Sequence, residues 1–483
     1  MKKKCVAMML IAIMTASLAG CGSSKDGSGK SVKLDSDHPV SLTIWHYYNG
    51  AQQAMFDTLV KEFNASVGKE EGIYVESYSQ GSVSDLEEAV NSSLNGEVGA
   101  EELPDIFSSY SDTAYAVQQQ DKLADLSVYF TEDELSRYVD SYIQEGYFNQ
   151  DGALYLFPVA KSTEITMINK TDWEPFAEAT GTTVEELATT EGIAEVAQRY
   201  YEWTDEQTPD VPDDGKAFYG RDSMSNYFII GMKQMGKEIF QVKDGKMTLN
   251  TDEDLIRRLW DNYYVPYMKG YFASLGKFRS DDVKTGDILA YTGSTSSAVY
   301  FPDTVEIGNK SYPIDYIVCD SPVMEGGENI KVQQGAGMAV TKSDEEHEYA
   351  ASVFLKWFTQ KNQNLRFVCE SSYMPVLKEA NSALDSVIKE NNIEVNQKVY
   401  DCFTTEMEDF DKTSFYTIGA FDNSYSARKI LDYSLADKAK ADKDAMDDAI
   451  ADGESREEAL AQYLTDENFQ SWYTEFCHSL ECI

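Results

Sequence analysis

The segment WHYYNG, residues 45–50, carries four ring side chains into an Asn-Gly pair. Aromatic faces pack against the apolar side of a sugar ring, so this pattern is suited to carbohydrate binding. Adjacent strand residues point in opposite directions, so we expect one of Tyr47 and Tyr48 to pack into a core and the other to stack on a ligand. For any single ring, the alternative is that it only covers the edge of a sheet.

A strand and a helix must position this segment. Apolar residues alternate with polar ones over 40–44, which predicts a strand, and they recur at helical spacing after residue 50. Further strands are predicted over 72–79 and 103–110, with a helix over 82–97. Strands that alternate with helices predict right-handed crossovers, a mostly parallel sheet and an α/β fold.

Polar and aromatic side chains gather at the carboxyl ends of these predicted strands. Residues 45–49, 78–80 and 108–112 all fall at such ends. Ligands of open α/β sheets bind in the crevice beyond the carboxyl ends of the strands. The sequence therefore predicts a ligand site where these three segments meet.

The N-terminus predicts export and a lipid anchor. Three lysines precede an apolar stretch that is long enough for a signal peptide and too short to span a membrane as a mature helix. The stretch closes with residues 18–21, Leu-Ala-Gly-Cys, which resemble the bacterial lipobox. We expect residues 1–20 to be removed, Cys21 to be acylated (with palmitate, for example) at the extracytoplasmic face of the cell membrane, and 21–37 to be a flexible linker.

The composition of the chain limits the kinds of partner that it can bind. The chain has 83 acidic and 41 basic residues and a net charge of −42, which argues against nucleic acid and anionic lipid surfaces as partners. The four histidines are scattered without zinc-site spacing, and we expect neither a metal nor a cofactor. Without Cys5 and Cys21 the number of cysteines is odd, so at least one thiol stays unpaired unless it bonds between chains.

The motifs of common enzymes are missing. The sequence has no G-x-S-x-G, and His347 lacks the second histidine of a zinc protease. The glycines of 335–340 lack a third glycine for dinucleotide binding. With 83 acidic residues, pairs of carboxylates occur by chance, so such a pair neither identifies nor excludes the catalytic dyad of a glycosidase. We expect a protein that is not an enzyme, with a lipid-anchored carbohydrate-active enzyme or a sensor as lesser alternatives.

Six segments in this order and spacing resemble one known family. They are LTIWHYYNG (42–50), LPDIF (103–107), DGALYLFPVAKSTEITMINK (151–170), GSTSSAVYF (293–301), GAGMAVTKSDEEHEYAASVFLKWFTQ (335–360) and SSYMPV (371–376). The chain thereby resembles the family 1 extracellular solute-binding proteins, which deliver substrates to ABC importers. The resemblance covers nearly all of the chain that follows the linker.

The resemblance implies an α/β fold of the two-lobed, periplasmic-binding-protein type (type II). The lobes are discontinuous and are joined by a hinge that lets them close on the ligand. We expect lobe one to comprise residues 38–160 and 318–367, and lobe two 161–317 and 368–483. We also expect a monomer.

The implied function is that of the lipid-anchored substrate-binding component of an ABC importer. Such a protein captures a mono- or oligosaccharide between its lobes and delivers it to the permease subunits. A neighbouring branch of the family binds glycerol phosphate. A glycerol-phosphate or other polar small-solute binding protein is therefore the alternative.

Carried over position by position, the resemblance also implies the ligand contacts. They are Tyr47, Tyr48, Asn49, Ser79, Gln80, Tyr110, Asp112, Ser162, Ser294, Ser296, Gly335, Gly337 and Tyr373. Arg428 lies where the glycerol-phosphate branch carries a ligand arginine, and a helix-surface salt bridge is its alternative role. The sequence departs from the family after the hinge proline, where Lys161 and Glu164 stand in place of uncharged residues.

Overall fold

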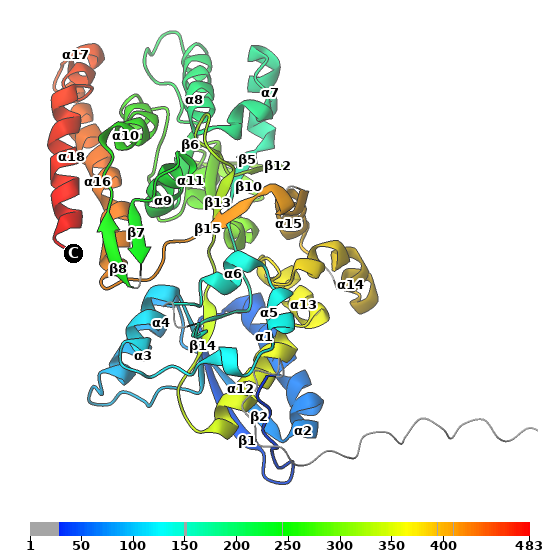
Figure 1. Ribbon diagram of the computed structural model, residues 1–483. Coiled ribbons are helices and arrows are strands. Elements are labelled where there is room, and N and C mark those ends of the chain that lie inside the picture. Colours follow the sequence, from blue (N-terminus) through cyan, green and yellow to red (C-terminus); the bar gives the residue numbers. More distant parts are fainter. Residues whose placement is uncertain (1–28, 149–151, 244, 394, 409) are drawn as a thin grey trace, which may run out of the picture.

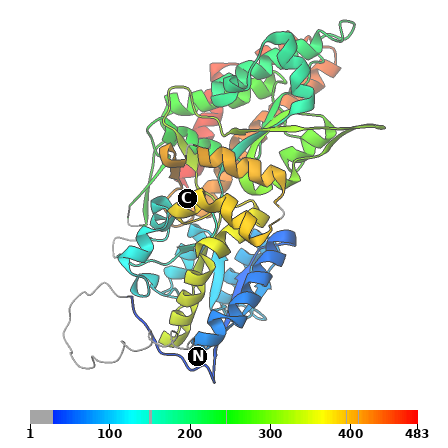
Figure 2. The ribbon, with the colours of Figure 1, turned by 90° about the vertical axis from the view of Figure 1, so that its right-hand side faces the viewer.

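The computed structural model describes residues 29–148, 152–243, 245–393, 395–408 and 410–483. The predicted lipobox and Cys21 lie outside these ranges. Within them the chain forms two lobes, one above the other in Figures 1 and 2. No helix of the described ranges combines the length and the apolar character that crossing a membrane requires.

Lobe one is built on a five-stranded sheet with the order β2-β1-β3-β14-β4. Its strands are β1 (Val40–His46), β2 (Ile73–Ser79), β3 (Ile106–Ser109), β4 (Phe157–Pro158) and β14 (Gly337–Val340). The first three strands are parallel, as predicted, whereas β14 runs antiparallel to β3 and β4. The parallel part follows from the short strand–helix crossovers, and β14 is the strand by which the chain returns from lobe two.

The pattern around residues 40–65 folds as its periodicity predicts. Leu42 and Ile44 of β1 are fully buried, and α1 (Gly50–Ala65) buries Phe56, Leu59 and Phe63 on one face. The remaining helices of lobe one are α2 (Val67–Glu71), α3 (Val83–Leu94), α4 (Ser111–Gln118), α5 (Glu132–Ser136), α6 (Asp140–Gln144), α12 (Glu345–Phe358), α13 (Lys361–Ser371) and α14 (Leu384–Asn391).

Lobe two has a four-stranded sheet with the order β12-β5-β9-β6. Its strands are β5 (Glu164–Asn169), β6 (Tyr219–Arg221), β9 (Ala290–Ser294) and β12 (Tyr316–Asp320). Its helices are α7 (Lys170–Thr180), α8 (Thr190–Asp205), α9 (Met224–Gln234), α10 (Glu253–Met268), α11 (Arg279–Thr285), α15 (Gln397–Glu408), α16 (Ser424–Ala451), α17 (Arg456–Ala461) and α18 (Asp466–Glu481). Three two-stranded ribbons complete the fold: β7 (Phe240–Lys243) with β8 (Lys246–Leu249), β10 (Thr304–Ile307) with β11 (Lys310–Pro313), and β13 (Ile330–Val332) with β15 (Ser414–Tyr416).

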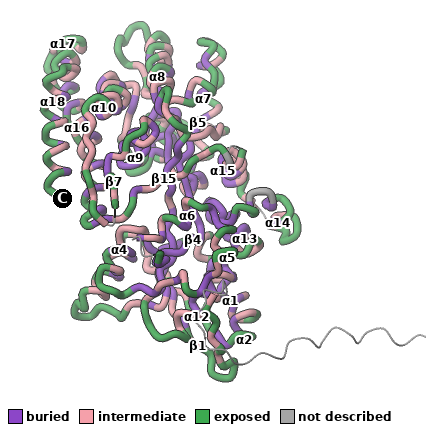
Figure 3. Tube along the Cα trace, viewed as in Figure 1, coloured by how far each residue is buried: buried purple, intermediate pink, exposed green. Residues whose placement is uncertain are grey.

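Each lobe has its own hydrophobic core, so buried residues concentrate in both halves of Figure 3. The cysteines in the described ranges form no disulfide within the chain. They are Cys319, Cys369, Cys402, Cys477 and Cys482.

The structure divides the chain at later points than those expected from the resemblance. Residues 316–320 form β12, which pairs with β5 in the lobe-two sheet, so the return to lobe one begins after residue 332 and not at 318. Phe367 and Val387 pack into the lobe-one core, so lobe one extends past 367 through α14. The difference arises because β12 extends the sheet that β5 begins, and such pairing is decided by tertiary contacts.

Two chain segments cross between the lobes side by side. The backbone N–H groups of Ser162 and Gln334 each donate to the other residue's carbonyl, at 2.9 and 2.8 Å. Gly335 has φ of +88°, and a Cβ there would lie 2.8 Å from the Ala160 carbonyl oxygen. Only glycine combines this backbone conformation with so close an approach. The hinge is therefore a closely packed pair of extended strands.

Candidate functional site

A pocket of about 290 Å³ lies between the lobes and is called the interlobe pocket below. Lobe one contributes α3, the start of α4 and the end of α6 to its wall, and lobe two contributes the start of α16 and the segment before it. Its principal side chains are Glu87, Tyr110, Asp112, Glu145, Gln333, Gln334, Tyr425, Arg428, Lys429, Asp432 and Tyr433.

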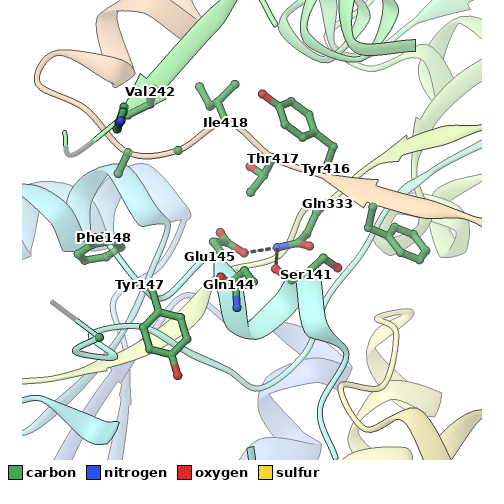
Figure 4. Close-up of a pocket in the computed structure, with 15 residues that line it drawn as sticks. Ser141, Gln144, Glu145, Tyr147, Phe148, Val242, Gln333, Tyr416, Thr417 and Ile418 are labelled. Carbon is green, nitrogen blue, oxygen red and sulfur yellow. Dashed lines mark hydrogen bonds between the residues drawn. The ribbon is translucent and has the colours of Figure 1, made fainter. Parts of the chain in front are cut away.

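Two wider cavities continue the interlobe pocket on either side. The hinge-side cavity, about 910 Å³, shares Glu145, Gln333 and residues 417–420 with it (Figure 4). The outer cavity, about 970 Å³, shares Glu87 and Asp112. The three form one groove along the segment that joins β15 to α16.

One face of α16 forms the lobe-two wall. Arg428 and Lys429 follow Tyr425 by three and four residues, and Asp432 and Tyr433 follow Arg428 and Lys429 by four residues each, which places all five on one side of the helix. The tyrosine side chains stay accessible, with exposed fractions of 47% for Tyr425 and 58% for Tyr433. The helix therefore presents two aromatic platforms with charged groups between them.

Carboxylates of lobe one face that helix. Asp112 begins α4, where its Oδ1 accepts a hydrogen bond from the Thr113 backbone, and Glu87 lies on α3. Burial and, to a smaller extent, the neighbouring Asp112 carboxylate raise the pKa of Glu87 to about 7, against the opposing effect of the Lys429 ammonium. Glu87 therefore gains or loses a proton near neutral pH and can either donate or accept a hydrogen bond.

A buried network closes the floor of the groove. The Lys161 ammonium lies 2.5 Å from Glu145 Oε2 and 2.8 Å from the Gly335 carbonyl oxygen. Gln333 Nε2 donates to the same Glu145 oxygen at 2.6 Å and to the Ser141 carbonyl at 3.2 Å (Figure 4). Glu145 thereby ties both crossing strands to the end of α6, and it lines the groove as well.

The second hinge charge, Glu164, is paired in the opposite lobe. Glu164 accepts hydrogen bonds from Arg221 at 3.0 Å and from Asn226 at 2.8 Å. Arg428 donates in turn to Asn226 Oδ1, at 3.2 Å, and to Ser225 Oγ. Lys161 and Glu164 therefore do not pair with each other. Lys161 contacts Glu145 of lobe one directly, and Glu164 is linked to Arg428 of lobe two through Asn226.

Three of the predicted contacts, Tyr110, Asp112 and Arg428, come together in the interlobe pocket. The Arg428 guanidinium donates through Nη2 to two uncharged partners, Ser225 and Asn226. Among the described residues no salt bridge to Arg428 is found, so the surface salt bridge that was its alternative role does not form. Its guanidinium therefore contributes a positive charge to the pocket.

The expectation that Tyr47 and Tyr48 are not both buried in the same core is wrong. Tyr48 is 1% exposed and packs among His46, Phe56 and Phe367. Tyr47 is 8% exposed, and its hydroxyl lies 3.1 Å from that of Tyr373. Both are covered because α13 and the chain after it pack over the end of β1. As far as the described residues define them, the three cavities do not include these tyrosines.

The other predicted contacts of lobe one hold the turn after β1. Asn49 Nδ2 donates to the carbonyls of Tyr47, at 2.9 Å, and Gly81, at 2.8 Å. Ser79 Oγ donates to the Tyr48 carbonyl at 2.9 Å, and the Gln80 backbone N–H donates to the His46 carbonyl. These contacts are structural and lie beside the groove.

The remaining predicted contacts lie in the hinge and in the elements next to it. Ser162 and Gly335 lie in the crossing strands, and a Cβ at Gly337 would lie 2.7 Å from the Leu156 side chain. Ser294 caps the short helix Thr295–Tyr300, where its Oγ lies 2.8 Å from that of Ser296. Close packing and capping explain these residues in this conformation.

Sequence reasoning missed several residues of the interlobe pocket. They are Glu87, Glu145, Gln333, Gln334, Tyr425, Lys429, Asp432 and Tyr433. The signal for α16 was present, because residues 424–434, SYSARKILDYS, place two tyrosines and two cations on one helical face. The polar face of a surface helix gives the same signal, so periodicity did not identify it.

The comparisons with known proteins agree with this architecture. A family model described as "Bacterial extracellular solute-binding protein" matches residues 58–394, more than half of the chain. None of the curated proteins matches the chain. Several solved structures, in contrast, match it over nearly its whole length.

Three of these structures illustrate the likeness. The cyclic alpha-maltosyl-1,6-maltose binding protein of Arthrobacter globiformis is 19% identical, with a TM-score of 0.64, and covers 92% of this chain and 100% of its own. UgpB of Mycobacterium tuberculosis, in complex with glycerophosphocholine, is 17% identical, with a TM-score of 0.62 and coverages of 92% and 98%. An ABC substrate-binding protein of Listeria monocytogenes, in complex with cycloalternan, is 16% identical, with a TM-score of 0.62 and coverages of 92% and 99%. At these identities, the likeness establishes the two-lobed fold.

Proposed function

Because this chain belongs to the bacterial extracellular solute-binding proteins, we propose that it captures a carbohydrate between its lobes and delivers it to the permease of an ABC importer. The interlobe pocket is the observation that carries this proposal. Tyr425 and Tyr433 are about half exposed there, beside carboxylates and cations that can hydrogen-bond to hydroxyl groups. Aromatic faces with a few placed polar groups suit a sugar ring.

The charges of the pocket favour a neutral ligand. Glu87 and Asp112 of lobe one face Arg428 and Lys429 of α16, Asp432 lies beside these two cations on the same helix, and Glu145 is already paired with Lys161, so neither sign dominates. An anion such as a glycerol phosphodiester would meet three carboxylates, and a polyamine would meet two cations. A neutral polyhydroxyl ligand can use both kinds of group, because carboxylates accept and guanidinium groups donate hydrogen bonds. The likeness to UgpB keeps the glycerol-phosphodiester alternative worth testing.

A ligand screen by thermal unfolding tests this function. A ligand at 100 times its Kd stabilises the folded state by about 2.7 kcal/mol, which raises Tm by roughly 5–10 °C for lobes of this size. We expect such a shift with a neutral saccharide, and none with glycerol phosphodiesters or polyamines. A shift with a phosphodiester and with no saccharide would overturn the carbohydrate assignment.

Paired variants then locate the binding. Tyr425→Ala should weaken the saccharide by about ten- to a hundredfold, since ring packing contributes on the order of 1–3 kcal/mol. Tyr74→Ala is the matched control, because Tyr74 on β2 has the same exposed fraction, 47%, away from the groove. Equal losses in both variants would place the ligand elsewhere.

We further propose that the protein acts as a monomer without catalytic activity, held at the outer face of the cell membrane through acylated Cys21. Residues 18–21 resemble the lipobox, and the Gly/Ser-rich residues after Cys21 suit a tether, which ends at Lys30, where the backbone N–H donates to the Val128 carbonyl of lobe one at 2.8 Å. Replacing Cys21 with Ser should release the protein from the membrane or block its processing. Fractionation with an antibody against the mature chain checks this. A processed Cys21→Ser protein that stays in the membrane would contradict the anchor.

A further inference from the structure

A second pocket lies on lobe two beside the interlobe pocket and is called the lobe-two pocket below. It has a volume of about 480 Å³ and is lined by lobe-two residues. Asp432 and Tyr433 line both pockets, so the two cavities adjoin at this point of α16. The function proposed above uses the interlobe pocket and assigns no role to this one.

Two large aromatic side chains stand more than half exposed at the lobe-two pocket. Phe278 is 53% exposed and Tyr433 is 58% exposed, and they come from different elements, the start of α11 and the face of α16. Neither ring is needed to fill a core. Exposed aromatic rings around a concave surface are typical of a ligand site.

The pocket has a polar floor. The rings of Tyr263 and Tyr267 are buried and stack with centroids 5.9 Å apart. The Arg221 side chain is 8% exposed, and its Nε is buried without a hydrogen-bond partner among the described residues. Asp222 accepts a hydrogen bond from the Arg279 backbone at 2.9 Å and adds a carboxylate. Phenol, guanidinium and carboxylate groups below aromatic rings suit a hydroxyl-rich, uncharged ligand.

A single face of α16 connects the two pockets. Tyr425 and Lys429 line the first, Asp432 and Tyr433 line both, and Lys440 lines the second. At 1.5 Å per residue, the stretch from 425 to 440 is roughly 22 Å long. This length exceeds what one sugar ring spans, so one extended ligand can contact both ends.

We propose that the lobe-two pocket is a second saccharide subsite, in which Phe278 and Tyr433 hold the outer end of a linear oligosaccharide whose other end lies in the interlobe pocket. This inference rests on the function proposed above. It adds that lobe two alone binds the protruding end of the ligand, and that affinity depends on ligand length.

Calorimetry with ligands of increasing length tests the subsite. The probes are linear gluco-, galacto-, manno- and xylo-oligosaccharides of one to six units. For the series that binds, Phe278→Ala should weaken oligomers of about four or more units by about tenfold, and monomers and dimers by less than about twofold. Phe278→Tyr keeps the ring and should retain the length dependence.

Leu275→Ala is the control, because Leu275 lies in the same loop, is 66% exposed and is outside the lining of the lobe-two pocket. It should leave affinity unchanged at every length. If Phe278→Ala binds all lengths as the unmodified protein does, the subsite is refuted and the proposed function stands. If the unmodified protein binds no saccharide of any series, the proposed function fails and the subsite fails with it.

Discussion

Replacing Lys161 with Met is expected to lower the free energy of unfolding by about 3–5 kcal/mol, because it leaves a buried carboxylate without its counter-charge. The side chains of Lys161 and Glu145 are 1% and 6% exposed. In the unmodified protein Glu145 accepts hydrogen bonds from the Lys161 ammonium and the Gln333 amide. In the variant only the Gln333 amide would remain. Urea unfolding of the lobe-one transition measures the loss.

Two companion variants separate the charge from the side-chain volume. In Lys161→Met/Glu145→Gln the carboxylate is gone and the amide of residue 145 can still accept from Gln333, so we expect most of the loss to be recovered. Lys342→Met is the exposed control: Lys342 pairs with Asp121 at 2.7 Å with side chains 49% and 78% exposed, and should change stability by less than about 1 kcal/mol. A double variant no more stable than the single one would mean that packing, and not charge, is what Lys161 supplies.

Replacing Tyr48 with Ala is expected to destabilise lobe one by about 3–5 kcal/mol, as the removal of a large buried aromatic side chain does. Tyr48 is enclosed by rings, with centroids 5.0 Å from Phe367 and 5.2 Å from Phe56. The neighbours are held by helices and cannot close the resulting cavity fully. Thermal and urea unfolding measure this effect.

The same variant decides between a core and a ligand role for Tyr48. Tyr48→Phe keeps the packed ring and should cost less than about 1 kcal/mol, and Tyr78→Ala, at a 47% exposed site on β2, should be within about 0.5 kcal/mol of the unmodified protein. A Tyr48→Ala protein with unchanged stability and a weakened ligand would restore the sequence-based expectation that this ring stacks on the ligand.

The local elements of lobe one were predictable because their signals are local. Alternation over 40–44 and helical spacing after residue 50 were enough to place β1 and α1. Strand–helix alternation was enough to predict parallel pairing of β1 with its neighbours. Strand ends could then be located, and two residues of the interlobe pocket, Tyr110 and Asp112, follow such an end.

The burial of Tyr47 and Tyr48 could not be predicted from the residues next to them in the sequence. Phe367 and Tyr373, more than 300 residues later, cover them. Neighbouring strand residues do point in opposite directions, but a second layer of chain can cover the side chains on both sides of the strand. Burial is a property of the assembled lobe, and no local window contains that information.

The sequence by itself determined the α/β class and the presence of two unusual charges at the hinge. Tertiary structure alone decided that one face of α16 lines a groove. It also decided that Lys161 pairs with Glu145 in lobe one and Glu164 with Arg221 in lobe two. The physical reason is the range of the interactions: periodicity and turn chemistry act over a few residues, whereas a site between two lobes exists only where distant segments meet. Glu145, Gln333 and Tyr425 lie far apart in the chain and become one surface when both cores have formed.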